Sequence, residues 1–364
     1  MPFCAHHCGY CDFAVAAGQD HLTELYLDAL DAELSTLQRP EAVSTAYLGG
    51  GTPTHLNAEQ LARLMQSIRR WLVLMPGFEF SIEANPATLT AEKIDVLAEF
   101  GVNRVSLGAQ SFNPLLLSVL ERDHQPSDVP AAVELVRKRV RQVSLDLIFG
   151  VPGETRQDWE IDVKHVLSLK PDHISTYGLT YEKGTRLWKQ RERGEVQALD
   201  DEHELALYKH GMDALTATGF EHYEISNFAL PERRCRHNEV YWANEAYFGF
   251  GMGAARYVHG RRELNTRDLR EYIRRCLAGE SPVFQSEQLP PEERARETMA
   301  IQLRRSEGIN RPHFTQQTGF ELDTIAGEAI ERNVTRGLLE ANSENVRLTC
   351  QGKCVADAVI RDLF

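Results

Sequence analysis

The chain has 364 residues, of which 42% are hydrophobic and 26% charged, and this composition excludes a disordered, collagen-like or small disulfide-stapled protein. Forty Lys and Arg residues against 53 Asp and Glu residues leave a net charge of −13, which argues against nucleic acid or an anionic membrane surface as a partner. The seven cysteines do not fit a secreted disulfide framework, and we find neither a signal peptide nor an integral membrane span. We therefore expect a cytoplasmic protein.

Cys4, Cys8 and Cys11 form the pattern C-x-x-x-C-x-x-C. Three thiolates on one short loop can hold a cubane iron–sulfur cluster and leave one iron open to an exchangeable ligand. A structural zinc site needs a fourth protein ligand, which His6 or His7 could supply. The spacing thus predicts a metal centre and favours an iron–sulfur cluster over zinc.

From about Asp20 to Leu179, helical and strand-like patterns alternate, which is typical of parallel βαβ units. A helix that Pro40 ends is followed by one capped by Asn57, and then by helices over 90–100, 128–140 and 155–169. Between them we predict five strands, over 44–48, 78–83, 103–107, 144–148 and 173–177. Periodicity alone leaves open whether these strands form an open sheet or most of a barrel.

Glycines and polar residues stand at or just after the C-terminal ends of these strands. They are Gly49 to Thr52, Glu83, Gln110, Asp146 and Tyr177. Because parallel strands place these ends at one edge, where α/β proteins hold their ligands, we expect the side chains to meet there.

Beyond Leu179 the alternation stops. A helix over 200–218 leads into an aromatic stretch, 220–257, that the pattern does not assign, and 279–291 has the composition of a linker. The rest predicts short helices, a strand over 345–349 and a last helix, which together indicate a mainly helical, winged-helix-like domain. We divide the chain into residues 1–180, 181–285 and 286–364.

The loop Cys4-Ala-His-His-Cys8-Gly-Tyr-Cys11 resembles the cluster loop of the radical S-adenosylmethionine (SAM) superfamily. This resemblance implies a 4Fe-4S cluster on the three cysteines, whose open iron binds SAM. It also implies an α/β fold, a (β/α)6 barrel. Relatives have a strand immediately before the cysteine loop, so we expect an incomplete barrel with an unpaired edge beside that loop.

The same resemblance implies which residues contact SAM. Arg122 suits the methionine carboxylate, and carboxylates suit the ribose hydroxyls or the methionine ammonium group. The implied contacts are Tyr10, Gly50, Gly51, Thr52, Glu83, Gln110, Arg122 and Asp146.

Within the superfamily, nearly the whole chain is similar to the oxygen-independent coproporphyrinogen III oxidases and their relatives, the HemW-type haem chaperones. The oxidases have a fourth cysteine two residues after the third, where this chain has Phe13. The haem-binding branch has the element H-N-x-x-Y-W, which is present here from His237 to Trp242. We therefore favour a haem chaperone and assign no catalytic residue. The alternative is an enzyme that catalyses the oxidative decarboxylation of coproporphyrinogen III.

For this branch, His237 is a possible axial haem ligand, and Tyr241 and Trp242 are possible flat walls of a haem site. Propionates could pair with Arg234, Arg236 or Arg256. The alternative is that His237 makes polar contacts in a turn while the two aromatic residues pack between domains. The branch usually has a histidine near Ala255, so its loss here predicts weaker haem binding or none. The implied partners are haem, an unidentified haem acceptor and a reductant protein such as flavodoxin or ferredoxin.

Overall fold

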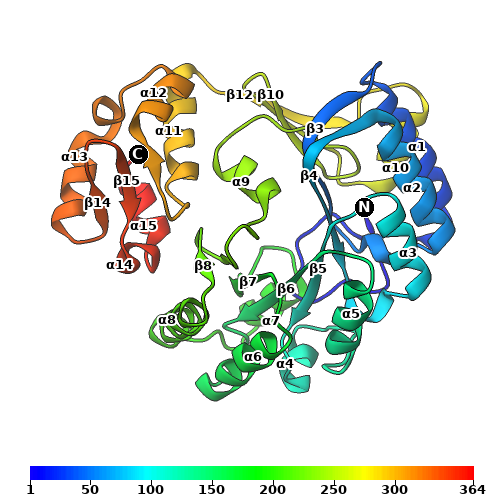
Figure 1. The fold of residues 1–364 in the computed structure, drawn as a ribbon, viewed down its shortest axis with the longest axis horizontal. Coiled ribbons are helices and arrows are strands. Elements are labelled where there is room, and N and C mark those ends of the chain that lie inside the picture. The colour runs from blue at the N-terminus through cyan, green and yellow to red at the C-terminus, as the bar shows by residue number, and fades with distance from the viewer.

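The computed structural model describes residues 1–364 and is built around a curved sheet of seven strands (Figure 1). Five strands are parallel, which confirms the predicted set: β3 (Glu41–Leu48), β4 (Leu72–Ala84), β5 (Arg104–Gln110), β6 (Gln142–Phe149) and β7 (His173–Gly178). Two short antiparallel strands, β9 (Asn227–Ala229) and β8 (Glu221–His222), extend the sheet beyond β7. The sheet is therefore a half-barrel.

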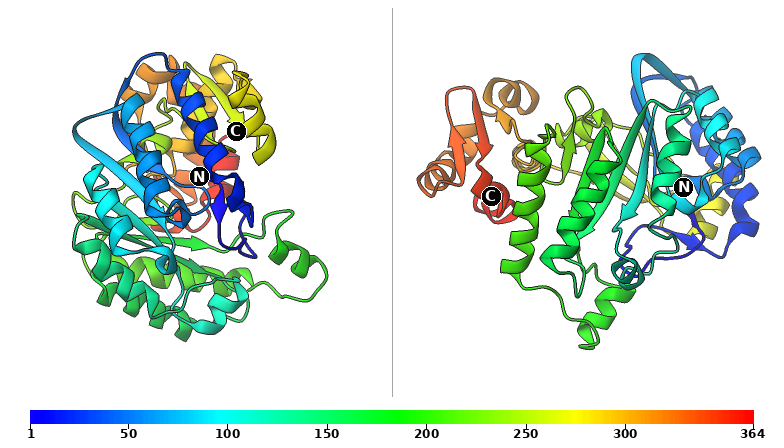
Figure 2. Two further views of the ribbon diagram at one scale, coloured as in Figure 1. Left: turned by 90° about the vertical axis from the view of Figure 1, so that its right-hand side faces the viewer. Right: turned by 60° about the horizontal axis from the view of Figure 1, so that its bottom comes forward.

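The crossover helices cover the outer, convex side of this sheet (Figures 1 and 2). They are α1 (Thr23–Ser35), α2 (Ala58–Trp71), α3 (Ala91–Glu99), α5 (Asp128–Arg137) and α6 (Arg156–Ser168), with the short α4 (Pro114–Val119) after β5. Asn57 caps α2 as predicted: its side chain accepts from the Gln60 backbone N–H, and the Gln60 side chain accepts from that of Asn57. Single 3-10 turns, Asp20–Leu22, Pro53–His55 and Pro86–Thr88, connect the other elements.

Alternate residues of the parallel strands face opposite sides of the sheet. The outward residues Val105, Leu107, Val143 and Leu145 are fully buried in the main apolar core against the helices. The inward residues of the same strands are polar and line the hollow of the half-barrel, among them Arg104, Ser106, Ser144, Asp146, His173 and Ser175. A sheet whose outer face is apolar and whose inner face is polar leaves room for a ligand inside.

The N-terminal residues cover the end of β3 that lies beside the cysteine loop. The Met1 amino group donates to the Gly49 carbonyl at 2.8 Å, and the Gly51 N–H donates to the Met1 carbonyl at 2.6 Å. The Thr52 N–H donates to the Phe3 carbonyl at 2.8 Å. β1 (Phe3–Cys4) then pairs with β2 (Ala16–Ala17). These contacts satisfy backbone groups of the glycine segment after β3, whereas β3 itself remains the outermost strand of the sheet, as expected for an incomplete barrel.

Residues 179–288 contain four helices, α7 (Arg186–Glu192), α8 (Asp201–Ala217), α9 (Arg236–Trp242) and α10 (Leu269–Leu277). The segment around α7 projects from the body (Figure 2). β10 (Ala255–Val258), β11 (Arg261–Asn265) and β12 (Val283–Gln288) form an antiparallel sheet. The predicted linker over 279–291 is therefore wrong. Five of the six β12 residues are exposed, so the segment has no apolar alternation to mark it as a strand.

The C-terminal residues have an apolar core of their own, which includes Met299, Phe314, Ile330 and Val359. Its helices are α11 (Pro291–Gln302), α12 (Arg311–Thr318), α13 (Leu322–Thr335), α14 (Cys350–Lys353) and α15 (Ala356–Asp362). Three antiparallel strands, β13 (Ile309–Asn310), β14 (Leu339–Ala341) and β15 (Asn345–Leu348), pack with them. The division of the chain at residues 180 and 285 stays a prediction.

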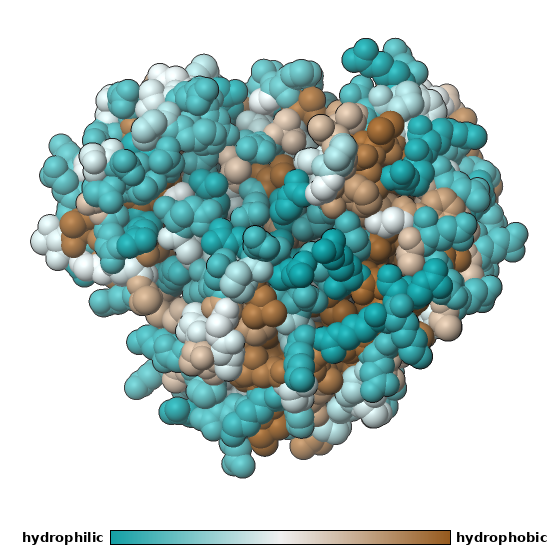
Figure 3. Space-filling model, in the orientation of Figure 1, coloured by the Kyte–Doolittle hydropathy of each residue, from teal (hydrophilic) through white to brown (hydrophobic).

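The molecular surface is mostly hydrophilic on the face drawn in Figure 3, with apolar side chains showing between charged ones in the lower half. None of the helices combines the length and the apolar character that crossing a membrane requires.

A buried carboxylate lies where the half-barrel meets the C-terminal core. Glu224 is 1% exposed, bridges to Arg305 through the backbone and accepts from the Ser226 N–H at 3.1 Å. Burial raises its pKa to about 7. Between its unfolded value near 4.5 and about pH 7, the folded chain therefore holds a proton that the unfolded chain has lost.

We expect Glu224→Gln to unfold at about the same temperature as the wild type at pH 5, and about 3–8 °C higher at pH 8. The stability that Glu224 contributes is present below its unfolded pKa and is lost as pH rises through the folded value, and the neutral amide removes this loss. Calorimetry at both pH values checks it, with the exposed Glu340→Gln as control. An equal pH dependence in wild type and Glu224→Gln would contradict the assignment.

Candidate functional site

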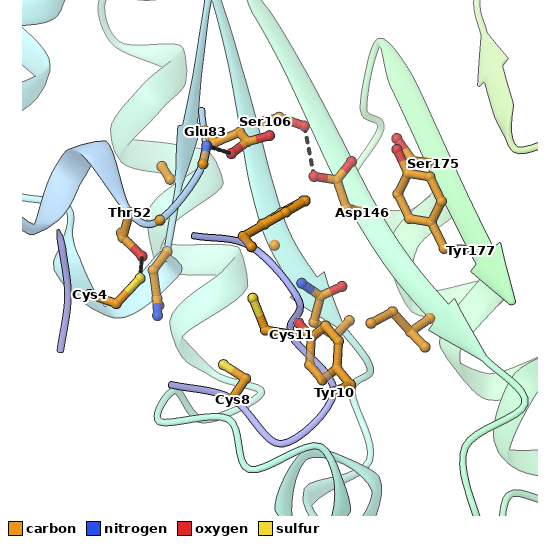
Figure 4. Close-up of a pocket in the computed structure, with 18 of the residues that line it drawn as sticks. Cys4, Cys8, Tyr10, Cys11, Thr52, Glu83, Ser106, Asp146, Ser175 and Tyr177 are labelled. Carbon is orange, nitrogen blue, oxygen red and sulfur yellow. Dashed lines mark hydrogen bonds between the residues drawn. The ribbon is translucent and has the colours of Figure 1, made fainter. Parts of the chain in front are cut away.

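A cavity of about 640 Å³ occupies the hollow of the half-barrel. The cysteine loop closes one side of it, and the inner faces of β4 to β7 form the opposite wall (Figure 4). All eleven residues that the sequence assigns to the cluster and to SAM line this cavity: Cys4, Cys8, Tyr10, Cys11, Gly50, Gly51, Thr52, Glu83, Gln110, Arg122 and Asp146. Residues far apart in the chain therefore converge on one space.

The cysteine loop is anchored at its middle. The Gly9 N–H donates to the Leu120 carbonyl at 3.3 Å, and the Gly9 carbonyl accepts from the Leu187 N–H at 2.8 Å. Cys4 Sγ lies 3.3 Å from Thr52 Oγ1, and Arg122 Nη1 lies 3.6 Å from Cys8 Sγ. The loop thus holds three free, half-buried thiols toward the cavity, with Cys4 at the end of β1 and Cys8 and Cys11 outside any helix or strand.

The thiols suit a cluster better than a single metal ion. No three His, Cys, Asp or Glu side chains gather closely enough to hold one ion, whereas a cubane binds each thiolate at a different iron. His6 contacts Glu121, and His7 Nε2 lies 2.9 Å from the Cys11 carbonyl. The geometry therefore gives no support to a zinc site completed by either histidine.

Burial raises the pKa of the Cys4 thiol, and it raises that of Cys11 to about 11. The positive charge of the Arg122 guanidinium lowers the pKa of both thiols, but by less than burial raises it. The Cys4 and Cys11 thiols are thus held protonated at neutral pH, and iron must displace these protons when it binds.

The glycine segment after β3 brings its backbone close to the loop. Gly50 has a φ of +109°, which an L side chain rarely adopts. A Cβ on Gly51 would lie 2.8 Å from the Pro2 carbonyl oxygen. The Gly50 N–H donates to Glu83 Oε2 at 3.0 Å (Figure 4). Glycine is required here because the backbone itself forms the wall of the cavity.

Two carboxylates extend into the cavity, one from β4 and one from β6, the strands on either side of β5. Glu83 accepts from Tyr47 Oη at 2.9 Å, and burial raises its pKa to about 7. Asp146 accepts from Ser106 Oγ at 2.8 Å, and burial raises its pKa as well. Such groups can accept hydrogen bonds from ribose hydroxyls or pair with an ammonium group.

Gln110 and Arg122 meet at a bulge in β5. The register shifts between Gly108 and Gln110, and Gln110 has a φ of +61°. Arg122 Nη2 donates to the Gly108 carbonyl at 3.0 Å, and a Cβ on Gly108 would lie 2.8 Å from Gln110 Nε2. A local strained backbone thus aims both side chains into the cavity. Tyr10, on the cysteine loop, packs against a small apolar cluster that includes Leu120 and Leu187.

Sequence reasoning missed the deeper lining of the cavity: Tyr47, Arg104, Ser144, His173, Cys235 and Asn238. His173 is fully hydrogen-bonded, by Ser144 Oγ at 2.8 Å and Tyr223 Oη at 2.7 Å. The strand residues among these could have been found, because they stand two, four or six positions before a predicted site residue on the same face. Cys235 and Asn238 had no such signal.

The H-N-x-x-Y-W element forms α9, whose first turn lies against β4. Glu79, on β4, accepts from the backbone N–H groups of Arg236 at 2.9 Å and His237 at 3.2 Å. The Arg104 guanidinium donates to the Arg233 carbonyl at 2.7 Å. The two side chains satisfy backbone groups at the start of α9 and fix it against the sheet.

His237 is buried and both ring nitrogens have partners. Nδ1 lies 2.9 Å from Thr45 Oγ1, and Nε2 lies 2.7 Å from Tyr241 Oη. This is the alternative reading of the element, polar contacts within the fold, and the arrangement argues against His237 as an axial haem ligand. Tyr241 is 38% exposed, and Trp242 lies half-buried under the Arg304 guanidinium.

The three arginines suggested for propionates are already engaged. Arg234 pairs with Glu221, Glu239 and Glu307, and Arg256 pairs with Glu263. Arg236 donates to the Gly77 carbonyl at 2.5 Å. Ala255 is exposed at the start of β10. Arg234 and Arg256 are thus paired with carboxylates and Arg236 with a carbonyl, and the pairing of these arginines with propionates stays a prediction.

Comparisons with known proteins establish the family of the chain. Residues 1–166 match the radical SAM superfamily, and residues 289–355 match the HemN C-terminal domain. The heme chaperone HemW of Bacillus subtilis is 37% identical over 99% of this chain and 96% of its own length. The heme chaperone HemW of Mycobacterium tuberculosis strain H37Rv is 36% identical over 100% of this chain and 93% of its own length.

Among solved structures, the coproporphyrinogen III oxidase HemN from Escherichia coli, described as a radical SAM enzyme, superimposes with a TM-score of 0.87. The match covers 100% of this chain and 88% of the oxidase, at 22% sequence identity. At this identity the likeness establishes the fold: a half-barrel with a C-terminal domain.

Proposed function

The chain belongs to the HemW family of the radical SAM superfamily, and from this premise we propose that it is a haem chaperone that holds a 4Fe-4S cluster and SAM and passes haem to an acceptor protein. The observation that carries the proposal is the match to haem chaperones along nearly the whole length of both chains. The cavity supports it, because three thiols and a polar wall occupy one space.

Cys4, Cys8 and Cys11 would hold the cluster through three of its irons. The fourth iron would bind the amino and carboxylate groups of SAM and make electron transfer to it possible. Arg122, 3.6 Å from Cys8 Sγ, offsets the negative charge of bound thiolates and can pair with the SAM carboxylate. Glu83 and Asp146 would accept from the ammonium and ribose hydroxyl groups, while the Gly50 to Thr52 backbone and Tyr10 would close the site around them.

Haem would bind outside this cavity, on the exposed side of α9. Tyr241 offers a partly exposed ring, and Trp242 offers an indole beside the Arg304 cation. We assign His237 no iron bond, because binding iron would cost it the hydrogen bond from Thr45 or from Tyr241. An electron donor such as flavodoxin or ferredoxin and a haem acceptor complete the proposed set of cytoplasmic partners.

A haemin titration of the anaerobically reconstituted protein tests this function. We expect saturable binding of about one haem per chain, with little or no conversion of coproporphyrinogen in a parallel assay that contains SAM and reductant. His237→Ala should leave the visible haem bands in place, whereas Trp242→Ala should weaken binding about 3–30-fold through the lost aromatic contact. Conversion of coproporphyrinogen without haem binding would replace the chaperone by the oxidase.

A further inference from the structure

A row of aromatic rings leads from the cavity to the protein surface. Tyr47 lines the cavity, and its ring stacks on His237 with centroids 5.3 Å apart and planes at 19°. The His237 and Tyr241 centroids lie 4.9 Å apart, and those of Tyr241 and Tyr247 lie 4.6 Å apart. Tyr241 is 38% exposed. Van der Waals contact is thus continuous from the cavity wall to solvent.

Two of these phenols have a proton acceptor within hydrogen-bond distance. Tyr47 Oη donates to Glu83 Oε1 at 2.9 Å. Tyr241 Oη lies 2.7 Å from His237 Nε2. The Thr45 hydroxyl, 2.9 Å from Nδ1, can accept from a protonated Nδ1, which leaves the Nε2 lone pair facing Tyr241. A tyrosine loses an electron at neutral pH only when its phenolic proton can leave, so each acceptor makes its phenol oxidisable.

We propose that Tyr47, His237, Tyr241 and Tyr247 form a path that carries one-electron oxidising equivalents out of the cavity to the surface. The path protects the cavity, whose cysteine thiols and bound groups would otherwise absorb the oxidant. Packing alone would explain the ring contacts. It would not explain why Tyr47 and Tyr241 each have a proton acceptor within hydrogen-bond distance. The exposure of Tyr241 gives the path an exit that packing does not require either.

Each step balances in electrons and protons. Cluster iron would reduce peroxide by one electron to hydroxide and a hydroxyl radical; that radical takes one electron from Tyr47 and becomes hydroxide, while the phenolic proton passes to Glu83 Oε1. Tyr241 then gives one electron to the Tyr47 radical and its proton to His237 Nε2, while Glu83 or water returns a proton to Tyr47. A thiolate at the surface reduces the Tyr241 radical, His237 returns the proton, and a thiyl radical leaves. The origin of the oxidant at cluster iron rests on the proposed function, whereas the path through the aromatic residues does not.

The first test treats the reconstituted protein with hydrogen peroxide and freezes it for electron paramagnetic resonance. We expect a tyrosyl signal that narrows when the protein contains ring-deuterated tyrosine. Tyr241→Phe should lower this signal at least about fivefold and raise oxidation of the peptides that carry Tyr47 and the cysteine loop, measured by mass spectrometry. Tyr181→Phe is the matched control, since Tyr181 lies outside the row and its buried hydroxyl has no hydrogen-bond partner.

The second test uses the full chain without cluster or haem and a photogenerated ruthenium(III) oxidant in solution. We expect a tyrosyl radical that Tyr241→Phe suppresses and that His237→Phe slows by removing the proton acceptor, while Tyr181→Phe leaves it unchanged. Equal signals from wild type, Tyr241→Phe and Tyr181→Phe in both tests would overturn the path. A response in the second test with none in the first would keep the path and reject cluster iron as the source of the oxidant.

Discussion

Cys8→Ser is expected to lose the cluster: iron should fall from about four per chain in the reconstituted wild type to about a tenth of that or less. The reason is that each thiolate holds a different iron, and a serine hydroxyl does not replace a thiolate as a soft ligand. The loop offers no substitute, because His6 contacts Glu121 and His7 contacts the Cys11 carbonyl. Iron and sulfide analysis with the visible spectrum measures the loss.

Cys350→Ser is the matched control for this prediction. Cys350 is an exposed free thiol on α14 and lines no part of the cavity. Its replacement should leave iron and sulfide at wild-type levels. Full iron content in Cys8→Ser, or zinc in place of iron in the anaerobically purified wild type, would contradict the cluster assignment.

Glu83→Ala is expected to weaken SAM binding about 10–100-fold, the effect of losing a hydrogen bond to a charged group. Glu83 lies on β4 beside the glycine segment, and its two oxygens accept from the Gly50 N–H and from Tyr47 Oη. Alanine would remove the carboxylate from the ligand and leave both donors without their partner. Equilibrium dialysis with labelled SAM, on protein of equal iron content, gives the affinity.

Two further variants separate the carboxylate from its surroundings. Tyr47→Phe keeps Glu83 but removes one hydrogen bond to it, so we expect a smaller loss of SAM affinity, about 2–10-fold. Glu182→Ala removes an exposed carboxylate that also lines the cavity, and it should bind SAM as the wild type does. Wild-type affinity in Glu83→Ala would remove this residue from the proposed site.

The parts of the protein that sequence patterns reveal are those encoded by near neighbours in the chain. Cys4, Cys8 and Cys11 lie within eight residues of one another in the chain, so the sequence alone reveals the cysteine loop. The five parallel strands and their helices repeat with periods of two and 3.6 residues, and Asn57 marks a helix start by a contact three residues long. Strand ends that carry Glu83 and Asp146 follow from the same periodicity.

The structure adds to the sequence predictions where contacts between residues distant in the chain determine the local structure. β12 is a strand because β11 pairs with it, although its exposed side chains show no alternation. The glycine segment after β3 is held because Met1 and Phe3 exchange backbone hydrogen bonds with residues 49, 51 and 52. In both cases the backbone hydrogen bonds, which are common to all residue types, carry the interaction.

His237 shows most clearly what only the tertiary structure decided. The motif places a histidine four residues before a tyrosine on one helix turn, which suggested a free imidazole for iron. Folding brings Thr45, 192 residues away, to Nδ1 and stacks Tyr47 on the ring. Local periodicity and spacing in the sequence predicted the alternating helices and strands and the cysteine loop, and the resemblance of that loop indicated the family and the barrel. Whether a nitrogen is free depends on which side chains fill the space around it, and only long-range packing determines that.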